Sequence, residues 1–175
     1  DMGYDHLGTA ALYGFGKNEE LLNKAIGHRR SEYFLASKCG LYRDATGKRE
    51  INGRPEVLTK TCEDSLRRLG TDCIDLYYLH RIDLNVPVED SIGALMNMRD
   101  QGKIRFIGLS EPSPETLEKA LNLCQIAAVQ SELSLWTRSP NDTVADICGR
   151  KGIAFVSYSP LGRGFFGGKV RDTAV

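Results

Sequence analysis

The sequence has no long hydrophobic run and no excess of charge of either sign. None of its apolar runs approaches the roughly 18 residues that a membrane-spanning helix needs, and we expect no signal peptide. Its 23 basic and 23 acidic side chains leave a formal net charge of zero, so no overall field attracts nucleic acid or an anionic membrane. We expect a cytoplasmic protein that binds neither nucleic acid nor a membrane.

Cysteine patterns that mark cross-linked or zinc-binding proteins are also absent. The five cysteines are odd in number and include no Cys-x-x-Cys pair, which argues against a disulfide framework and against a zinc site. We expect reduced, mostly buried thiols and no bound metal. The 175 residues, 41% of them hydrophobic and 26% charged, are enough for one substantial core.

What the sequence does contain is a succession of short apolar runs, each followed by helical periodicity. Most runs are continuous, which is typical of parallel strands covered by helices. One helix is expected to begin at Asn18 as its N-cap, and another to run from Pro55 to Gly70. The polar stretch 40–54 is expected to form a long loop or lid. The predicted strands are 4–7, 33–37, 73–79, 104–109, 126–130 and 153–157.

Six strand–helix units in succession predict an α/β fold with a parallel sheet. Periodicity alone leaves two architectures open, a doubly wound open sheet and part of an eight-stranded barrel. The polar residues favour the barrel, because barrel enzymes gather such residues at the C-terminal ends of their strands. Each predicted strand ends near one of these residues: Tyr13, Lys38, His80, Ser110, Gln130 and Tyr158.

The segments GTAALYGFGKNEELL, EDSLRRLGTDCIDLYYLHRID, QGKIRFIGLSE and GIAFVSYSPLGRGF resemble the aldo-keto reductase family. The matching segments follow one another in family order over nearly the whole chain. The resemblance implies a (β/α)8 barrel of the TIM-barrel type, with six of its eight units present. It also implies reduction of aldehydes and ketones with NADPH, bound without a Rossmann fingerprint.

The resemblance assigns catalytic roles to three residues. Tyr13 matches the proton-donating tyrosine, which is a reluctant acid because its unperturbed pKa is about 10. Lys38 matches the lysine whose charge eases proton release, and His80 matches the histidine that orients the substrate carbonyl.

The resemblance also assigns residues to the cofactor. Ser110 and Gln130 resemble the residues that hold the nicotinamide carboxamide, and Tyr158 resembles the aromatic residue that stacks on the ring. Glu111 stands where many members carry Asn. Trp136 either lines a substrate pocket or packs. The loop resembling the one that wraps the pyrophosphate with backbone N–H groups is Ser159, Pro160, Leu161, Gly162, Arg163 and Gly164.

Two departures from the family pattern open an alternative function. Gly8 replaces the family aspartate that pairs with the lysine, so desolvation should lower the pKa of Lys38. We also expect residues 1–175 to form one barrel domain truncated at both ends, without the first and last strands and the contacts that select NADP over NAD. The alternatives to an active reductase are a catalytically impaired cofactor-binding or interaction protein and a fragment that binds no ligand.

Overall fold

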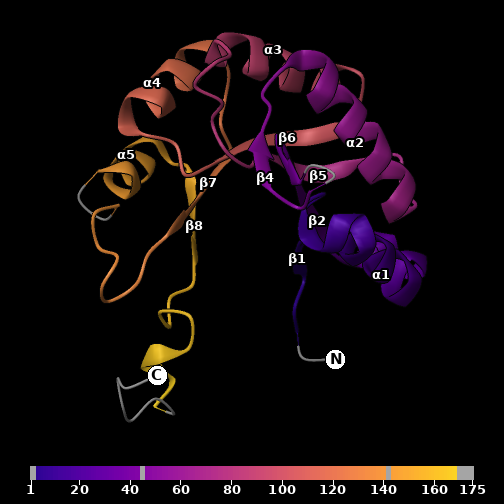
Figure 1. Ribbon diagram of the computed structural model, residues 1–175, viewed down its shortest axis with the longest axis horizontal. Coiled ribbons are helices and arrows are strands. Elements are labelled where there is room, and N and C mark those ends of the chain that lie inside the picture. The colour runs from indigo at the N-terminus through magenta and orange to yellow at the C-terminus, as the bar shows by residue number, and fades with distance from the viewer. Residues whose placement is uncertain (1–2, 44–45, 141–142, 169–175) are drawn as a thin grey trace.

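Six parallel strands form one sheet in the order β1-β2-β5-β6-β7-β8. The computed structural model describes residues 3–43, 46–140 and 143–168. Every predicted strand is present, with ends displaced by at most two residues. The sheet curls into a partial barrel, with β1 and β8 at its two edges (Figure 1). The strands are β1 (His6–Gly8), β2 (Phe34–Cys39), β5 (Ile74–Leu79), β6 (Ile104–Ser110), β7 (Ala128–Glu132) and β8 (Ala154–Tyr158).

The helices lie on the convex side of the curled sheet (Figure 1). A doubly wound sheet would carry helices on both faces. Of the two architectures left open by the sequence, the structure is therefore the barrel type. Pro55 opens its helix, and Gly70 ends it with a left-handed φ of 63°. The helices are α1 (Lys17–Ile26), α2 (Pro55–Leu69), α3 (Val88–Asp100), α4 (Pro114–Leu123) and α5 (Val144–Lys151), with 3-10 turns η1 (Tyr13–Gly16), η2 (Gly27–Glu32) and η3 (Phe165–Gly167).

The start of α1 differs from the predicted one. Gly16, not Asn18, is the N-cap, and its φ of 86° turns the chain from η1 into the helix. A Cβ at Gly16 would lie 2.6 Å from the Arg68 side chain, so both the conformation and the space require glycine. Asn18 lies inside α1, where its Oδ1 accepts a hydrogen bond of 2.7 Å from Thr9 Oγ1. A tertiary contact has therefore replaced the expected cap.

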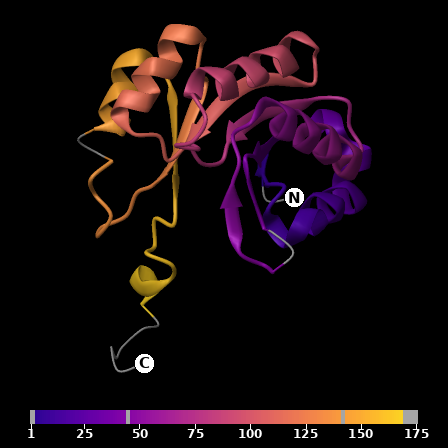
Figure 2. The same cartoon turned by 45° about the horizontal axis from the view of Figure 1, so that its top comes forward.

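The predicted loop 40–54 contains a small antiparallel hairpin, β3 (Leu41–Arg43) and β4 (Arg49–Ile51). Leu41 pairs with Ile51 across it, and the Tyr42 hydroxyl donates to the Glu50 carboxylate at 2.6 Å. Such cross-strand pairs stabilise short ribbons. The hairpin lies beside the strand ends (Figure 2), so the described residues of this segment include two short strands rather than a plain loop.

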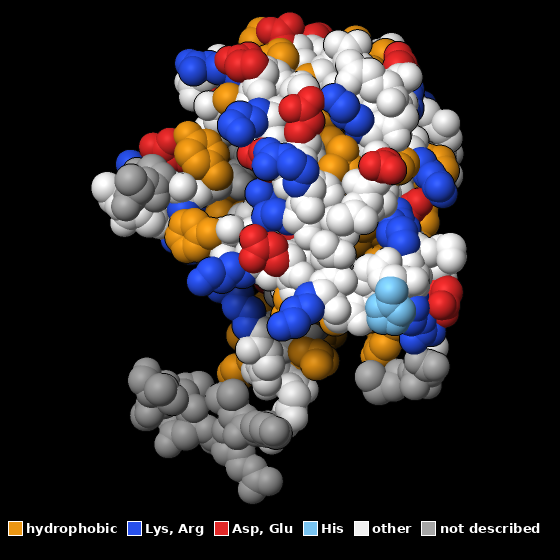
Figure 3. All heavy atoms as spheres, turned by 90° about the vertical axis from the view of Figure 1, so that its right-hand side faces the viewer, with side chains coloured by type: hydrophobic (Ala, Val, Ile, Leu, Met, Phe, Trp, Pro, Cys, Tyr) orange, Lys and Arg blue, Asp and Glu red, His pale blue; other side chains and the backbone are white. Residues whose placement is uncertain are grey.

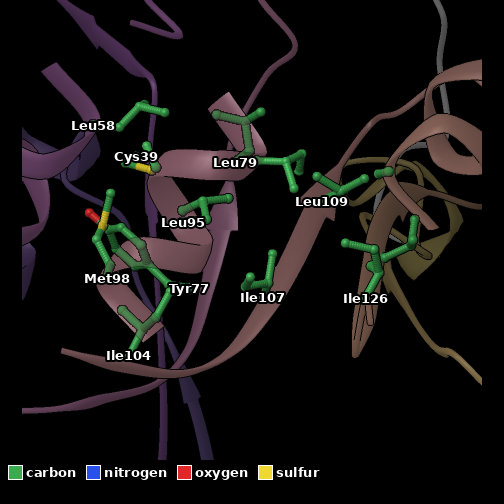
Figure 4. Packing of buried hydrophobic residues seen from close by; sticks show 14 of the residues in the cluster. Cys39, Leu58, Tyr77, Leu79, Leu95, Met98, Ile104, Ile107, Leu109 and Ile126 are labelled. Atoms are coloured by element: carbon green, nitrogen blue, oxygen red, sulfur yellow. The ribbon is translucent and has the colours of Figure 1, made fainter. Parts of the chain in front are cut away.

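The main core lies between the sheet and the helices. Alternate strand residues such as Tyr77 and Leu79 point outward and meet Leu58, Leu95 and Met98 of the helices (Figure 4). Their neighbours on β5 point inward, as strand geometry requires. β5 therefore packs on both faces of the sheet.

The inner face of the sheet is a smaller apolar surface. Ala36, Leu76, Tyr78 and Ala128 form a second buried cluster there, beside a hollow of about 360 Å³. Phe106 reaches into this hollow and stays 48% exposed. The outer surface over α1 and α2 mixes basic and acidic side chains (Figure 3). Over the described ranges, no helix has both the length and the apolar character that a membrane crossing requires.

Candidate active site

The C-terminal ends of the strands bring the predicted site residues to one rim of the sheet. Lys38 lies near the C-terminal end of β2, where it pairs with Tyr78 of β5. His80 directly follows β5. Ser110 and Gln130 are direct partners across β6 and β7. Paired residues of parallel strands project to the same face, so these side chains share the inner side of the rim. The topology thus gathers residues that are far apart in the sequence.

Tyr13 reaches this rim from η1, which follows β1. Its phenolic oxygen lies 3.4 Å from Lys38 Nζ, and the same Nζ lies 5.0 Å from the centre of the Tyr13 ring. Lys38 also donates a hydrogen bond of 2.9 Å to the Thr9 carbonyl oxygen. Lys38 is 4% exposed whereas Tyr13 is 40% exposed. The pair therefore presents a phenol toward solvent with a buried ammonium behind it.

The surroundings of Lys38 do little to stabilise its positive charge. Burial and then the charge of Arg81 lower the pKa of Lys38 to about 8, as the sequence led us to expect. No acidic residue in the described part of the chain forms an ion pair with it. A Cβ placed on Gly8 would meet nothing within 4 Å. The position of the family carboxylate is thus open, and a backbone carbonyl holds the lysine instead.

His80 faces Tyr13 edge to face, with ring centres 5.9 Å apart. The imidazole is 6% exposed. Burial, followed by the charges of Lys38 and Arg81, lowers the pKa of His80 to about 3. Nδ1 is buried and has no hydrogen-bond partner within the ranges that the structure describes. His80 is therefore a neutral imidazole near pH 7, suited to hydrogen bonding with a carbonyl group rather than to carrying charge.

The sequence interpretation missed the part that Arg81 plays. Its guanidinium donates to the Ser110 hydroxyl at 3.1 Å and to the His80 carbonyl oxygen at 2.6 Å. It therefore bridges the ends of β5 and β6 and adds a second positive charge beside Lys38. Its position directly after His80 was the available signal, but the contact with Ser110 depends on which strands are neighbours.

Glu111 also has a role that the sequence did not show. It adopts a left-handed φ of 54°, and its carboxylate accepts a hydrogen bond of 2.8 Å from the Glu132 backbone N–H. Burial, and then the hydrogen bond and charge of Glu111, raise the pKa of Tyr158 to about 12. The phenol of Tyr158 therefore stays protonated at this rim.

The loop predicted to hold a pyrophosphate has a strongly turned backbone. Four of its six residues have φ between 51° and 95°, namely Ser159, Gly162, Arg163 and Gly164. Turn hydrogen bonds use the N–H groups of Gly162 and Gly164. Pro160 has no N–H. Among the described residues, the N–H groups of residues 159, 161 and 163 have no backbone hydrogen-bond partner. Three N–H groups on a tightly turned loop are suited to an anion such as a phosphate.

Aromatic packing fixes the far side of this loop. The Trp136 ring lies 4.7 Å from Phe165 and 5.0 Å from Phe166, centre to centre. A Cβ on Gly162 would come within 2.9 Å of both Trp136 and Phe166. Trp136 thus packs against Phe165 and Phe166 and joins the loop after β7 to the loop after β8, while it stays 55% exposed.

Comparison with known proteins agrees with this geometry. A family profile described as the aldo/keto reductase family matches residues 1–174, and the chain belongs to that family. A "Probable aldo-keto reductase 1" of Glycine max is 44% identical over 162 residues, which cover 92% of this chain and 47% of the relative.

Solved structures of the same family superpose closely on this chain. Aldo-keto reductase AKR11C1 from Bacillus halodurans, in its holo form, matches with a TM-score of 0.89 and 30% identity over 99% of this chain and 58% of its own. Glycerol dehydrogenase AKR11B4 from Gluconobacter oxydans matches with a TM-score of 0.92 and 32% identity, over 99% of this chain and 54% of its own. The chain spans about half the length of these relatives.

Proposed function

We propose that the chain carries the reductase chemistry of its family: NADPH-dependent reduction of an aldehyde or ketone to an alcohol, with Tyr13 as proton donor. The observation that carries the proposal is the contact of 3.4 Å between the Tyr13 hydroxyl and Lys38 Nζ. A phenol gives up its proton more readily beside a positive charge. The substrate is a small carbonyl compound, and the free thiols support a cytoplasmic setting.

In this proposal, His80 and Tyr13 together hold the carbonyl oxygen. The neutral imidazole donates one hydrogen bond and the phenol donates the second, together with the proton. Lys38 stabilises the phenolate that remains, since its Nζ lies 3.4 Å from the phenolic oxygen. The exposed position of Tyr13 leaves room for a substrate in front of it, whereas Lys38 stays behind it and is shielded from solvent.

The rim residues fit a nicotinamide dinucleotide. The pairing of Ser110 with Gln130 across neighbouring strands supports a role for both in binding a carboxamide, and we assign Tyr158, at the end of the next strand, to stack on the nicotinamide ring. The loop 159–164 would hold the pyrophosphate through its backbone N–H groups. When bound, NADPH supplies the hydride. We assign the cofactor as NADPH from the family resemblance.

One experiment separates the proposal from its alternatives. Fluorescence titration with NADPH is followed by its oxidation in the presence of a reactive aldehyde, with Tyr13→Phe as the control. Binding with turnover that Tyr13→Phe abolishes supports the reductase. Binding without turnover identifies a cofactor-binding protein, and no binding identifies a fragment without ligand.

A second function, cofactor binding without efficient catalysis, is favoured by Gly8. Without a carboxylate beside it, Lys38 has a pKa of about 8, so part of the population loses the charge that assists Tyr13 as the solution becomes slightly alkaline. We also propose that residues 1–175 belong to one barrel domain. In both functions the fold and the nucleotide contacts are the same, and only the proton transfer differs.

A further inference from the structure

The space over Gly8 lies on the same face of the sheet as the Lys38 side chain. Gly8 pairs with Ala36 across β1 and β2, so a side chain at position 8 would project inward beside Ala36. Lys38 stands two residues further along β2 and shares that face. The backbone at Gly8 is exposed, and a Cβ there would meet nothing within 4 Å. A small solute can therefore enter this space from solvent.

The Lys38 ammonium has one donor more than it has partners. A lysine ammonium carries three N–H donors. One reaches the Thr9 carbonyl oxygen at 2.9 Å and another the Tyr13 hydroxyl at 3.4 Å. No other hydrogen bond of this group exists among the described residues, although the side chain is only 4% exposed. A buried charge with an unused donor is costly unless an acceptor reaches it.

The surrounding charges favour an anion in that space. The charge that acts on Lys38 is that of Arg81. The charges that act on His80 are those of Lys38, Arg81 and Arg49. All of these charges are positive. Tyr13, Tyr78 and His80 are the uncharged titratable groups that face Lys38. Within the described ranges, no carboxylate is among the charges that act on Lys38 or His80, so a bound anion would gain from several cations.

We propose that the space over Gly8 is a binding site for a small free carboxylate anion, which accepts the third hydrogen bond of Lys38. The side chain of aspartate beyond Cα has the heavy atoms of acetate. Acetate would therefore place its methyl group where the Cβ of an aspartate would lie and its carboxylate toward Nζ, a charge-assisted contact. The inference deepens the proposed function, because it rests on Lys38 acting on Tyr13.

The test follows the titration of Lys38 itself and needs no turnover. The protein is labelled with ¹³C-lysine, the Lys38 signal is assigned by its loss in Lys38→Met, and its pH midpoint is measured in chloride and in acetate at equal ionic strength. A nearby opposite charge raises a lysine pKa, here by about one unit. Acetamide, the neutral isostere, should leave the midpoint unchanged.

Two variants at position 8 locate the effect. Gly8→Asn fills the space without charge and should abolish the response to acetate. Gly8→Asp should raise the midpoint in chloride and make it insensitive to acetate. An unchanged midpoint in the parent, an equal response in Gly8→Asn, or an equal effect of chloride and acetate would each overturn the proposed carboxylate site. An inactive chain that still shows the acetate response would reject the reductase and keep the site.

Discussion

The Lys38 ammonium lies 3.4 Å from the Tyr13 hydroxyl, and the acceptor that holds it there is the Thr9 carbonyl at 2.9 Å. A carbonyl oxygen carries a partial charge, whereas a carboxylate carries a full one. The carbonyl fixes the position of Nζ but adds little support for its charge. Geometry and electrostatics are therefore separated in this site: the lysine stays in place while its pKa falls to about 8.

Replacing Lys38 by methionine should stabilise the fold at neutral pH. The folded-state pKa of about 8 lies below the ordinary value of 10.5, so folding favours the neutral lysine. The resulting cost is complete below about pH 8 and disappears as the pH rises to about 10.5. Such a difference corresponds to about 3 kcal/mol.

Urea unfolding of the parent and of Lys38→Met over this pH range measures the effect. The gap in the free energy of unfolding should close as the pH rises toward 10.5. Lys17→Met, an exposed change nearby, should give no such pH-dependent gap. If the difference in the free energy of unfolding between the two proteins did not change with pH, burial of the charged Lys38 would not destabilise the fold.

Removing Glu19 should strongly destabilise the protein. Its carboxylate is fully buried, accepts a hydrogen bond of 2.6 Å from Ser37 and pairs with Arg68 at 2.7 Å. Glu19→Ala leaves Arg68 without its partner, and we expect a loss of about 2–4 kcal/mol. Thermal unfolding provides the measurement, with the exposed neighbour change Glu20→Ala as the control. Similar melting temperatures for both variants would contradict the assigned role.

Adding a side chain at Gly162 should impair nucleotide binding through the loop. Gly162 has φ of 55°, and a Cβ there would lie 2.9 Å or closer to Phe166 and Trp136, so Gly162→Val must displace the loop. Trp136 is the sole tryptophan, and its emission should change. NADPH affinity should fall, whereas Gly167→Ala, where a Cβ meets nothing, should leave it unchanged. Unaltered NADPH affinity in Gly162→Val would remove this loop from the site.

The sequence predicted the strands and the rim well because both depend on local signals. Continuous apolar runs mark strands, and the polar residue that ends each run is carried to the rim by the parallel topology. The predicted N-cap of α1 was wrong because the Asn18 side chain accepts a hydrogen bond from Thr9 instead of capping the helix. Arg81 was missed because its contact with Ser110 requires knowing that β5 and β6 are neighbours. The hairpin of β3 and β4 was missed because strands of three residues are too short to give a recognisable alternation of apolar and polar residues.

Restoring the acid at position 8 should increase carbonyl reduction. Gly8→Asp is free of steric conflict, since its Cβ meets nothing within 4 Å. Its carboxylate would pair with Lys38, keep that group charged to higher pH and so favour proton release from Tyr13. A positioned acid with a matched pKa contributes about 10²–10⁴-fold. In the parent, Lys38 with its pKa of about 8 is mostly neutral above that pH, so we expect Gly8→Asp to recover about tenfold in kcat at about pH 9 and little at neutral pH.

The measurement is best made in a chimera in which the remaining barrel units come from the Glycine max relative. Gly8→Asn is the neutral isostere and should give no gain. Tyr13→Phe in the Gly8→Asp background should cancel the gain, because the carboxylate acts through Lys38 on the phenol. NADPH affinity should change much less than kcat, since the proposed nucleotide contacts come from residues 110, 130 and 158–164. A kcat no higher than that of the parent would show that Gly8 is a tolerated backbone choice at a strand end, and that Thr9 alone positions the lysine well enough.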